Sequence, residues 1–198
     1  MQPEEVMALL EAAGAVRRGH FELSSGMHSG TYVQCALVLQ NPADADRIGQ
    51  ALAERFHDVR IECVVSPAIG GIILGHEVAR ALRVRAVYVE RDSYGQMALR
   101  RGFELRPSEA VMVVEDVWTT GGSTAETIHV VEQNGGRVVA AGALIDRSWG
   151  GRARNELGVR GEALLDLEIP TYPPEDCPLC RAGGVANRPG SRFVRAGE

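Results

Sequence analysis

The chain has 198 residues, of which 45% are hydrophobic and 24% are charged, and its formal net charge is −5. These values predict one soluble globular domain with a substantial core, and they exclude an overall basic surface for nucleic acid. No apolar run reaches the ~18 residues of a membrane span, and no signal-peptide pattern opens the chain, so we expect a cytoplasmic protein. All 21 lysine and arginine positions are arginine, which excludes a Walker A loop and lysine Schiff-base chemistry.

The N-terminal part predicts a helix followed by short strands. Residues 3–13 place apolar residues among acids at helical spacing and end before Gly14. Residues 19–32 are rich in glycine and serine, with aromatic residues at each end, which indicates short strands and turns. We interpret His20 and His28 as loop residues, because neither has a nearby partner in sequence that would indicate a metal site.

Helices and strands alternate through the middle of the chain. Asn41 and Pro42 have the residue types of a helix N-cap and first helical position. The further elements expected there are a buried strand over 61–65, a helix over 72–82 and a strand over 85–90. This alternation predicts right-handed βαβ crossovers and a mainly parallel sheet.

Residues 91–102 interrupt the alternation. Three arginines, Arg91, Arg100 and Arg101, lie around a central glycine without clear periodicity, which predicts a mobile loop or a hairpin. The segment lies one strand before the glycine-rich turn described next, so we expect a functional lid. A solvated surface hairpin is the alternative.

Residues 111–124 are the most informative stretch. An unbroken apolar run is typical of a strand buried on both faces, and Glu115 and Asp116 follow where that strand should end. Hydroxyl and glycine residues come next, and a helix is expected over 125–131. Ligands bind at the carboxyl ends of parallel strands, where glycines admit a ligand and helix amides hold phosphate. The two carboxylates suit sugar hydroxyls or a cation, so we predict a ribose phosphate site; an ordinary strand-to-helix turn is the alternative.

The last third predicts one more strand and an irregular tail. The expected segments are a strand over 137–145 that ends in Asp146 and Arg147, a polar irregular stretch over 148–161, an edge strand over 162–169 and an irregular tail over 173–198. Cys177 and Cys180 have zinc-ligand spacing, but a tetrahedral site needs four ligands and the sequence offers no second pair. We interpret them as a structural turn, with a metal site across a dimer or a redox pair as alternatives. The remaining cysteines, Cys35 and Cys63, are expected to be buried thiols.

Residues 111–124 resemble the phosphoribosyl diphosphate signature of the type I phosphoribosyltransferases, in which an acidic pair precedes a threonine-glycine phosphate loop. Residues 21–26 resemble the hood motif of the orotate-specific branch, and residues 66–71 resemble its pyrophosphate loop. Asp146 and Arg147 are similar to a pair whose arginine binds the orotate carboxylate. The resemblance implies an α/β fold with a mainly parallel central sheet flanked by helices. It further implies one domain over 1–198, with a hood formed by 15–40 and the C-terminal segment, and a core over 41–147.

The resemblance also implies a role for each motif. The residues implied to bind phosphoribosyl diphosphate are Ala68, Ile69, Gly70, Gly71, Glu115, Asp116, Val117, Trp118, Thr119, Thr120, Gly121, Gly122 and Ser123. Those implied to bind orotate are Ser25, Gly26, Tyr32, Thr119 and Arg147, and those implied in catalysis are Glu115, Asp116, Arg91, Arg100 and Arg101. Mg²⁺ is the implied cofactor, held mainly by substrate oxygens, and a homodimer is implied in which the lid completes the neighbouring site. Arg147 can form a bidentate pair with a planar carboxylate; a structural ion pair with Asp146 or another acid is the alternative.

The sequence departs from the family pattern where lysine is common. It has Ser24 in the hood, Gly70 in the pyrophosphate loop and Gln96 in the lid, and no histidine lies in the lid. Arginine binds phosphate well but is a poor proton donor. We expect transfer of the 5-phosphoribosyl group to orotate in pyrimidine synthesis. The alternatives are transfer to another base and a non-catalytic sensor of phosphoribosyl diphosphate.

Overall fold

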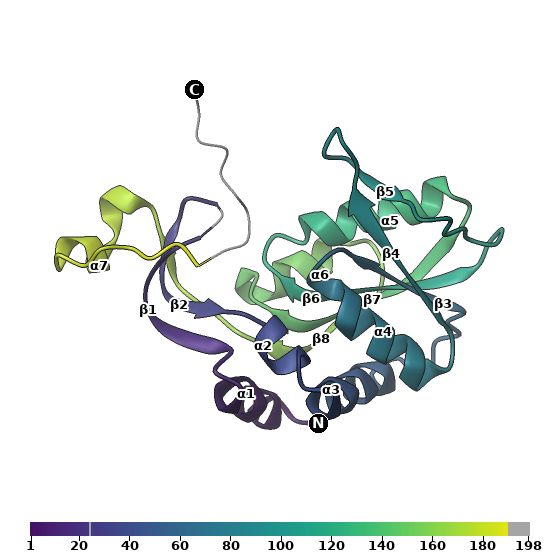
Figure 1. Ribbon diagram of the computed structural model, residues 1–198, viewed down its shortest axis with the longest axis horizontal. Helices are drawn as coiled ribbons and strands as arrows, with labels where there is room; N and C mark the ends of the chain where they lie inside the picture. The colour runs from purple at the N-terminus through teal and green to yellow at the C-terminus, as the bar shows by residue number, and fades with distance from the viewer. Residues whose placement is uncertain (24, 190–198) are drawn as a thin grey trace.

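A computed structural model describes residues 1–23 and 25–189 of the chain, which form two sheets and the helices around them (Figure 1). The strands are β1 (Val16–Glu22), β2 (His28–Val33), β3 (Cys63–Pro67), β4 (Arg85–Arg91), β5 (Met97–Leu99), β6 (Ala110–Trp118), β7 (Arg137–Asp146), β8 (Gly161–Asp166) and β9 (Thr171–Tyr172). The helices are α1 (Pro3–Ala12), α2 (Ala36–Leu39), α3 (Pro42–Glu54), α4 (Gly71–Leu82), α5 (Gly122–Gln133), α6 (Arg152–Glu156) and α7 (Pro178–Arg181). None of these helices is long and apolar enough to cross a bilayer.

The larger sheet has the strand order β5-β4-β3-β6-β7-β8. All neighbouring pairs in it are parallel except β4 and β5, which form an antiparallel hairpin. Alternate residues of each central strand enter two apolar clusters. Met112 of β6 packs in the cluster with α3 and α4, and Val113 packs in the cluster with α5. The expectation of a mainly parallel sheet flanked by helices is therefore confirmed.

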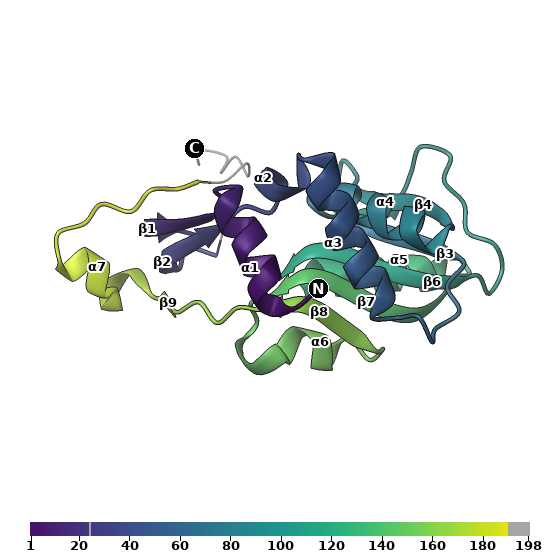
Figure 2. The ribbon, with the colours of Figure 1, turned by 90° about the horizontal axis from the view of Figure 1, so that it is seen from below.

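The smaller sheet, which we call the hood, lies to one side of the large sheet (Figure 2). It has the order β1-β2-β9 and is antiparallel throughout. Beyond β9 the chain passes through α7 and returns to β1, where the Glu22 amide donates to the Asn187 carbonyl at 2.8 Å. The hood thus joins residues from both ends of the chain.

Several expected boundaries differ from the structure. The strand β6 does not end before the acidic pair but runs through it, because Val117 and Trp118 pair with the end of β7. Helix α5 begins at Gly122, three residues earlier than expected. The stretch 148–161 was expected to be irregular, yet it contains α6, whose first turn is held by the Ser148 hydroxyl accepting from the Ala153 amide at 2.7 Å.

The C-terminal tail also differs from the expectation. It contains a 3₁₀ turn (Pro174–Asp176) and α7. These elements bring Cys177 and Cys180 beside His20 and His28. The interpretation of His20 and His28 as loop residues is therefore wrong, because His20 lies within β1 and His28 begins β2. The groups near these histidines in space come from the opposite end of the sequence. Residues 190–198 of the expected irregular tail lie outside the described residues.

Candidate active site

The acidic pair and the expected pyrophosphate loop meet at the carboxyl edge of the large sheet. Gly70 lies directly against Asp116, and a Cβ atom added to Gly70 would lie 2.7 Å from Asp116 Oδ1. Gly71 is equally confined, because its Cβ would lie 2.9 Å from the Val114 carbonyl oxygen. Gly71 therefore requires glycine, because its close neighbour is backbone, whereas a side chain at position 70 would displace the Asp116 carboxylate. Ile69, which the sequence also assigned to this loop, is exposed, and the peptide bond that precedes it is cis.

Glu115 is oriented by a chain of hydrogen bonds. The Trp118 indole Nε1–H donates to Thr124 Oγ1 at 2.9 Å, and the Thr124 hydroxyl donates to Glu115 Oε2. An indole nitrogen can only donate, so the direction of the chain is set from Trp118 to Glu115. The Trp118 side chain is fully buried, and its indole contributes to the site through this chain of hydrogen bonds. Thr124 was not among the site residues predicted from the sequence. Its position directly after Ser123 of the expected phosphate turn could have indicated a role in the site.

Asp116 lies in a poorly solvated position. Burial raises the pKa of its carboxyl above the ordinary value, and the Val117 amide, which donates to Oδ1 at 3.0 Å, offsets part of that rise. A carboxylate that has lost water is stabilised by positive charge close to it. The electrostatics of Asp116 thus favour a cation, or positive charge that develops on a bound ligand.

The turn from Thr119 to Ser123 offers unpaired amides at the start of α5. Gly121 has φ +75°, a conformation that favours glycine, and it packs against Ala153 of α6. The Gly122 amide donates to Thr120 Oγ1 at 3.3 Å. Within the described part of the chain, the amides of Ser123 and Thr124 have no protein acceptor. Such a turn can receive an anionic oxygen, as expected for a phosphate loop.

Arg147 lies near the hood residue Tyr32. Burial lowers the pKa of the Arg147 guanidinium, and Tyr32 acts in the opposite direction. Burial likewise raises the pKa of Tyr32, which also responds to the charges of Asp116 and Arg147. The charges of Asp116 and Arg147 thus both act on Tyr32, so the three side chains lie near one another, where the hood meets the large sheet.

The alternative that Arg147 forms a structural ion pair with Asp146 is not what the structure contains. Asp146 Oδ2 accepts from Arg154 Nε at 2.9 Å, and Asp146 Oδ1 accepts from the Ser148 amide at 2.9 Å. Among residues 1–23 and 25–189, no carboxylate forms an ion pair with Arg147. Its guanidinium therefore retains its capacity for an external anion.

The hood turn that was expected to contact orotate is held by its own backbone. The Gly26 amide donates to the Leu23 carbonyl at 2.9 Å, and the Met27 amide donates to Ser25 Oγ at 3.4 Å. In the described residues, neither Ser25 nor Gly26 bonds to the acidic pair or to Arg147. Ser24 lies outside the described residues.

The segment that was expected to form a lid is the β4–β5 hairpin, and its arginines pair with acids of the same chain. Arg91 contacts Glu126 of α5 at 2.9 Å. Arg101 makes a bidentate pair with Glu90, with both contacts at 2.9 Å, and Arg100 lies 3.8 Å from the same carboxylate. The structure thus brings none of the three to the acidic pair of its own chain. Solvent-exposed ion pairs contribute little to stability, so a polyphosphate can displace them.

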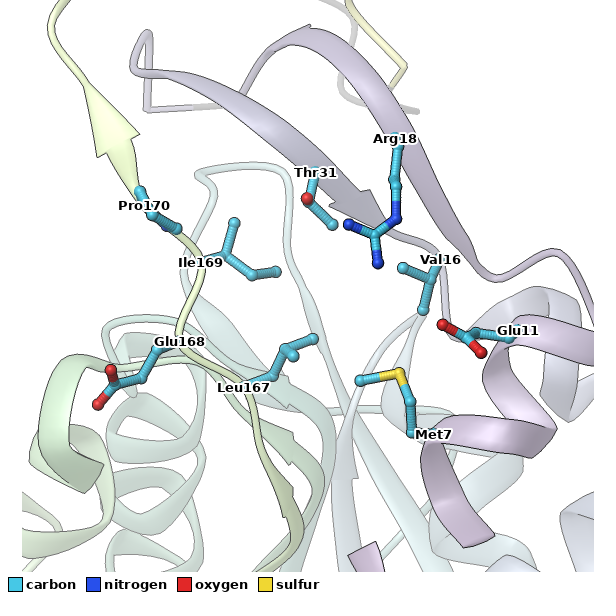
Figure 3. Close-up of a pocket in the computed structure, with 9 residues that line it drawn as sticks. All are labelled: Met7, Glu11, Val16, Arg18, Thr31, Leu167, Glu168, Ile169 and Pro170. Atoms are coloured by element: carbon cyan, nitrogen blue, oxygen red, sulfur yellow. The ribbon is translucent and has the colours of Figure 1, made fainter. Parts of the chain in front are cut away.

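A separate hollow of about 320 Å³ lies between α1, the hood and the segment after β8 (Figure 3). Its lining residues are Met7, Glu11, Val16, Arg18, Thr31, Leu167, Glu168, Ile169 and Pro170. Thr31 and Tyr32 are neighbours in a strand, so they point to opposite faces, and Thr31 lines this hollow while Tyr32 lies on the other face. The hollow contains one arginine and two glutamates, which does not suit a polyphosphate. The carboxyl end of β6 is therefore the better candidate for a polyphosphate site.

Comparison with known proteins agrees with this geometry. The phosphoribosyl transferase domain family matches residues 36–165. The chain is 50% identical over 194 residues to orotate phosphoribosyltransferase of Desulforamulus reducens, which covers 98% of this chain and 100% of the relative. It is 51% identical, with the same coverage, to orotate phosphoribosyltransferase of Pelotomaculum thermopropionicum.

Solved structures of similar proteins give the same result. The crystal structure of orotate phosphoribosyltransferase from Aeropyrum pernix matches with TM-score 0.68 at 31% identity and covers 81% of this chain and 93% of that one. The Mycobacterium tuberculosis H37Rv enzyme in complex with phosphoribosyl diphosphate also has TM-score 0.68, at 28% identity, with 82% and 94% covered. The chain therefore belongs to the phosphoribosyltransferase family and, within it, to the orotate phosphoribosyltransferases.

Proposed function

We propose that the protein transfers the 5-phosphoribosyl group from phosphoribosyl diphosphate to orotate, giving orotidine 5′-phosphate and pyrophosphate for UMP synthesis. The observation that carries the proposal is the half-buried Arg147 guanidinium, which has no acidic partner in the described chain and lies near Tyr32, a side chain that also responds to the charge of Asp116. Orotate carries a planar carboxylate that can form a bidentate pair with this guanidinium, and uracil and the purine bases do not. We expect the enzyme to act in the cytoplasm.

In this proposal, the two ends of phosphoribosyl diphosphate bind to different loops. The 5-phosphate binds the amides at the start of α5, which include those of Ser123 and Thr124. The pyrophosphate lies against the loop of Gly70 and Gly71, in which Gly70 lies directly beside Asp116. Both loops end at the same edge of the sheet, so the ribose spans the acidic pair.

The reaction then needs positioning and charge stabilisation more than covalent chemistry by the protein. The N1 atom of orotate bonds to C1 of the ribose and releases its proton to solvent, while the C1–O bond breaks and its electron pair leaves on a pyrophosphate oxygen. Asp116 and Glu115 stabilise the positive charge that develops near C1. The chain from Trp118 through Thr124 holds Glu115 in one orientation for this purpose.

Mg²⁺ is proposed as the cofactor of this site. The carboxylate oxygens of Glu115 and Asp116 are hard ligands of the kind that Mg²⁺ accepts, and the poorly solvated Asp116 is stabilised by a cation. When bound, the ion neutralises charge on the pyrophosphate, and we expect substrate oxygens to supply most of its ligands.

A homodimer is proposed because the lid arginines do not reach the acidic pair of their own chain. Arg100 and Arg101 contact Glu90, and Arg91 contacts Glu126. In the proposed dimer, the lid of one protomer lies at the site of its partner. There its arginines exchange these exposed ion pairs for contacts with pyrophosphate. A second candidate function is a non-catalytic sensor of phosphoribosyl diphosphate. It is favoured by the absence from the lid of the lysine that is common in the family.

The test measures loss of orotate absorbance with phosphoribosyl diphosphate and Mg²⁺, with uracil, adenine and hypoxanthine in parallel reactions. Consumption of orotate alone supports the proposal and shows that arginines suffice in the lid. Consumption of another base in place of orotate would show that this other base is the substrate. If no base reacts while calorimetry still detects phosphoribosyl diphosphate binding, the sensor function is correct.

A further inference from the structure

Four side chains outside the active site form a compact cluster of metal-binding groups. His20 lies on β1, His28 opens β2, and Cys177 and Cys180 lie at the start of α7 and within it. One ring nitrogen from each histidine and both sulfur atoms all lie within 4.8 Å of one another. The cysteines and His20 are about 160 positions apart in the chain, so their meeting is a product of the fold.

The distances in the cluster are those of a tetrahedral site. His20 Nε2 lies 2.9 Å from His28 Nδ1, 3.5 Å from Cys177 Sγ and 3.7 Å from Cys180 Sγ, and Cys180 Sγ lies 3.3 Å from His28 Nδ1. Zinc bonds of about 2.0 Å to nitrogen and 2.3 Å to sulfur place neighbouring tetrahedral ligands roughly 3.3–3.8 Å apart. Of these four distances, the three between nitrogen and sulfur fall in this range and the one between the two nitrogens is shorter, and all the ligand atoms lie within 4.8 Å of one another. The cluster therefore has the size and the donor set of a Cys₂His₂ zinc site.

The surroundings of His20 select the tautomer that a metal needs. His20 Nδ1 lies 3.2 Å from the Gly184 carbonyl oxygen. A carbonyl only accepts, so Nδ1 carries the proton and Nε2 directs its lone pair into the cluster. Metal-binding histidines commonly donate their other N–H to a carbonyl in this way. A Cβ on Gly184 would lie 3.2 Å from His20 Nδ1, so glycine lets the chain approach the ring.

The hood also has a structural need for such a link. Phe21 and Cys177 are buried, yet neither belongs to the two apolar clusters formed by the described residues. Small layers with little apolar core are commonly stabilised by a metal or a disulfide. Here the cluster joins β1, β2 and α7, which lie side by side at the end of the molecule far from the large sheet (Figure 1).

We propose that His20, His28, Cys177 and Cys180 bind one Zn²⁺ ion, which fastens the C-terminal segment to the hood. All four positions of the tetrahedron are filled by protein ligands, so the role is structural, with no open position for substrate. Thiolate and imidazole ligands select Zn²⁺ over Mg²⁺. This site is thus separate in place and in chemistry from the proposed Mg²⁺ at the acidic pair.

Metal analysis of the full-length protein, purified without added chelator, tests the proposal. We expect one zinc ion per chain, retained through gel filtration and lost in Cys180→Ser and in His28→Ala. The matched controls Cys63→Ala and His57→Ala change a cysteine and a histidine outside the cluster, and both should retain the metal. Chelation should lower the Tm of the natural protein by about 5 °C or more and leave that of Cys180→Ser unchanged.

A second measurement keeps the proposal testable if the variants do not fold. Co²⁺ added to the zinc-free natural protein should give tetrahedral d–d bands and thiolate-to-cobalt charge-transfer bands at one equivalent. Absence of these bands would overturn the proposal. If the protein contains no metal and has a disulfide between Cys177 and Cys180, the proposal is wrong and the two cysteines are a redox pair. Full zinc content in Cys180→Ser would show that the ion binds elsewhere. None of these readouts depends on enzyme activity.

Discussion

Replacement of Arg147 by alanine removes the one interaction on which base selection is proposed to rest. The guanidinium is half-buried beside Tyr32, and burial already lowers its pKa, so little water remains to replace a lost contact with orotate. Hydrogen bonds to charged groups contribute about 1.5–3 kcal/mol, and about 1.4 kcal/mol corresponds to a factor of ten. We therefore expect Arg147→Ala to raise the KM for orotate by about 10- to 100-fold. The KM for phosphoribosyl diphosphate should change much less.

The assay is steady-state orotate consumption with each substrate varied in turn. Arg147→Lys keeps the charge but loses the planar fork, so it should fall between the natural protein and Arg147→Ala. Arg152→Ala is the matched control, because Arg152 is an exposed arginine paired with Glu156 on α6. An equal rise in both KM values for Arg147→Ala would refute the assigned role, since a general disturbance of the site affects both substrates.

Three further substitutions test other parts of the structure. Asp116→Asn should lower kcat strongly and leave the Tm nearly unchanged; unchanged turnover would remove this residue from the site. Thr124→Val leaves the buried Trp118 N–H without an acceptor, which costs about 1–3 kcal/mol of stability and should also lower kcat through Glu115. A normal Tm in denaturation scans of Thr124→Val would contradict that hydrogen-bond chain. Glu109 pairs with Arg85 at 2.6 Å, and this pairing lowers the pKa of its carboxyl. The stability from this pair is therefore present above the ordinary glutamate pKa and is lost as the pH falls through the lowered one. Urea unfolding of Glu109→Gln should show a smaller loss of stability across that acidic range, and an unchanged pH profile would contradict this assignment.

Features that are local in the chain could be predicted from the amino-acid sequence alone. Apolar runs separated by helical segments indicated the mainly parallel sheet, because a strand covered on both faces needs contiguous apolar residues. The turn expected to bind phosphate was recognisable because Thr119 to Ser123 are consecutive in the sequence, although Gly121 also packs against Ala153 of α6. The cap at Asn41 is another case, and its side chain accepts from the Ala43 amide at 3.1 Å as the pattern predicted.

The tertiary structure decided the relations between segments that are distant in sequence. The sequence placed Asp116 and Gly70 in separate motifs, and only the pairing of β3 with β6 brings them into contact. The acidic pair lies within β6 and not beyond it, because hydrogen bonding to β7 continues past the apolar run. The pattern of apolar side chains shows which residues of a strand are buried. Where the strand ends also depends on how far the neighbouring strand, here β7, continues to pair with it.

The zinc cluster shows most clearly what sequence reasoning could not reach. Cys177 and Cys180 form half of a tetrahedral site, and their spacing says nothing about where the other half lies. His20 and His28 complete it only because β9 pairs with β2 and carries the C-terminal segment back to the hood. Four ligands around one ion are a condition on positions in space, and the fold alone brings the two ends of this chain to the same point.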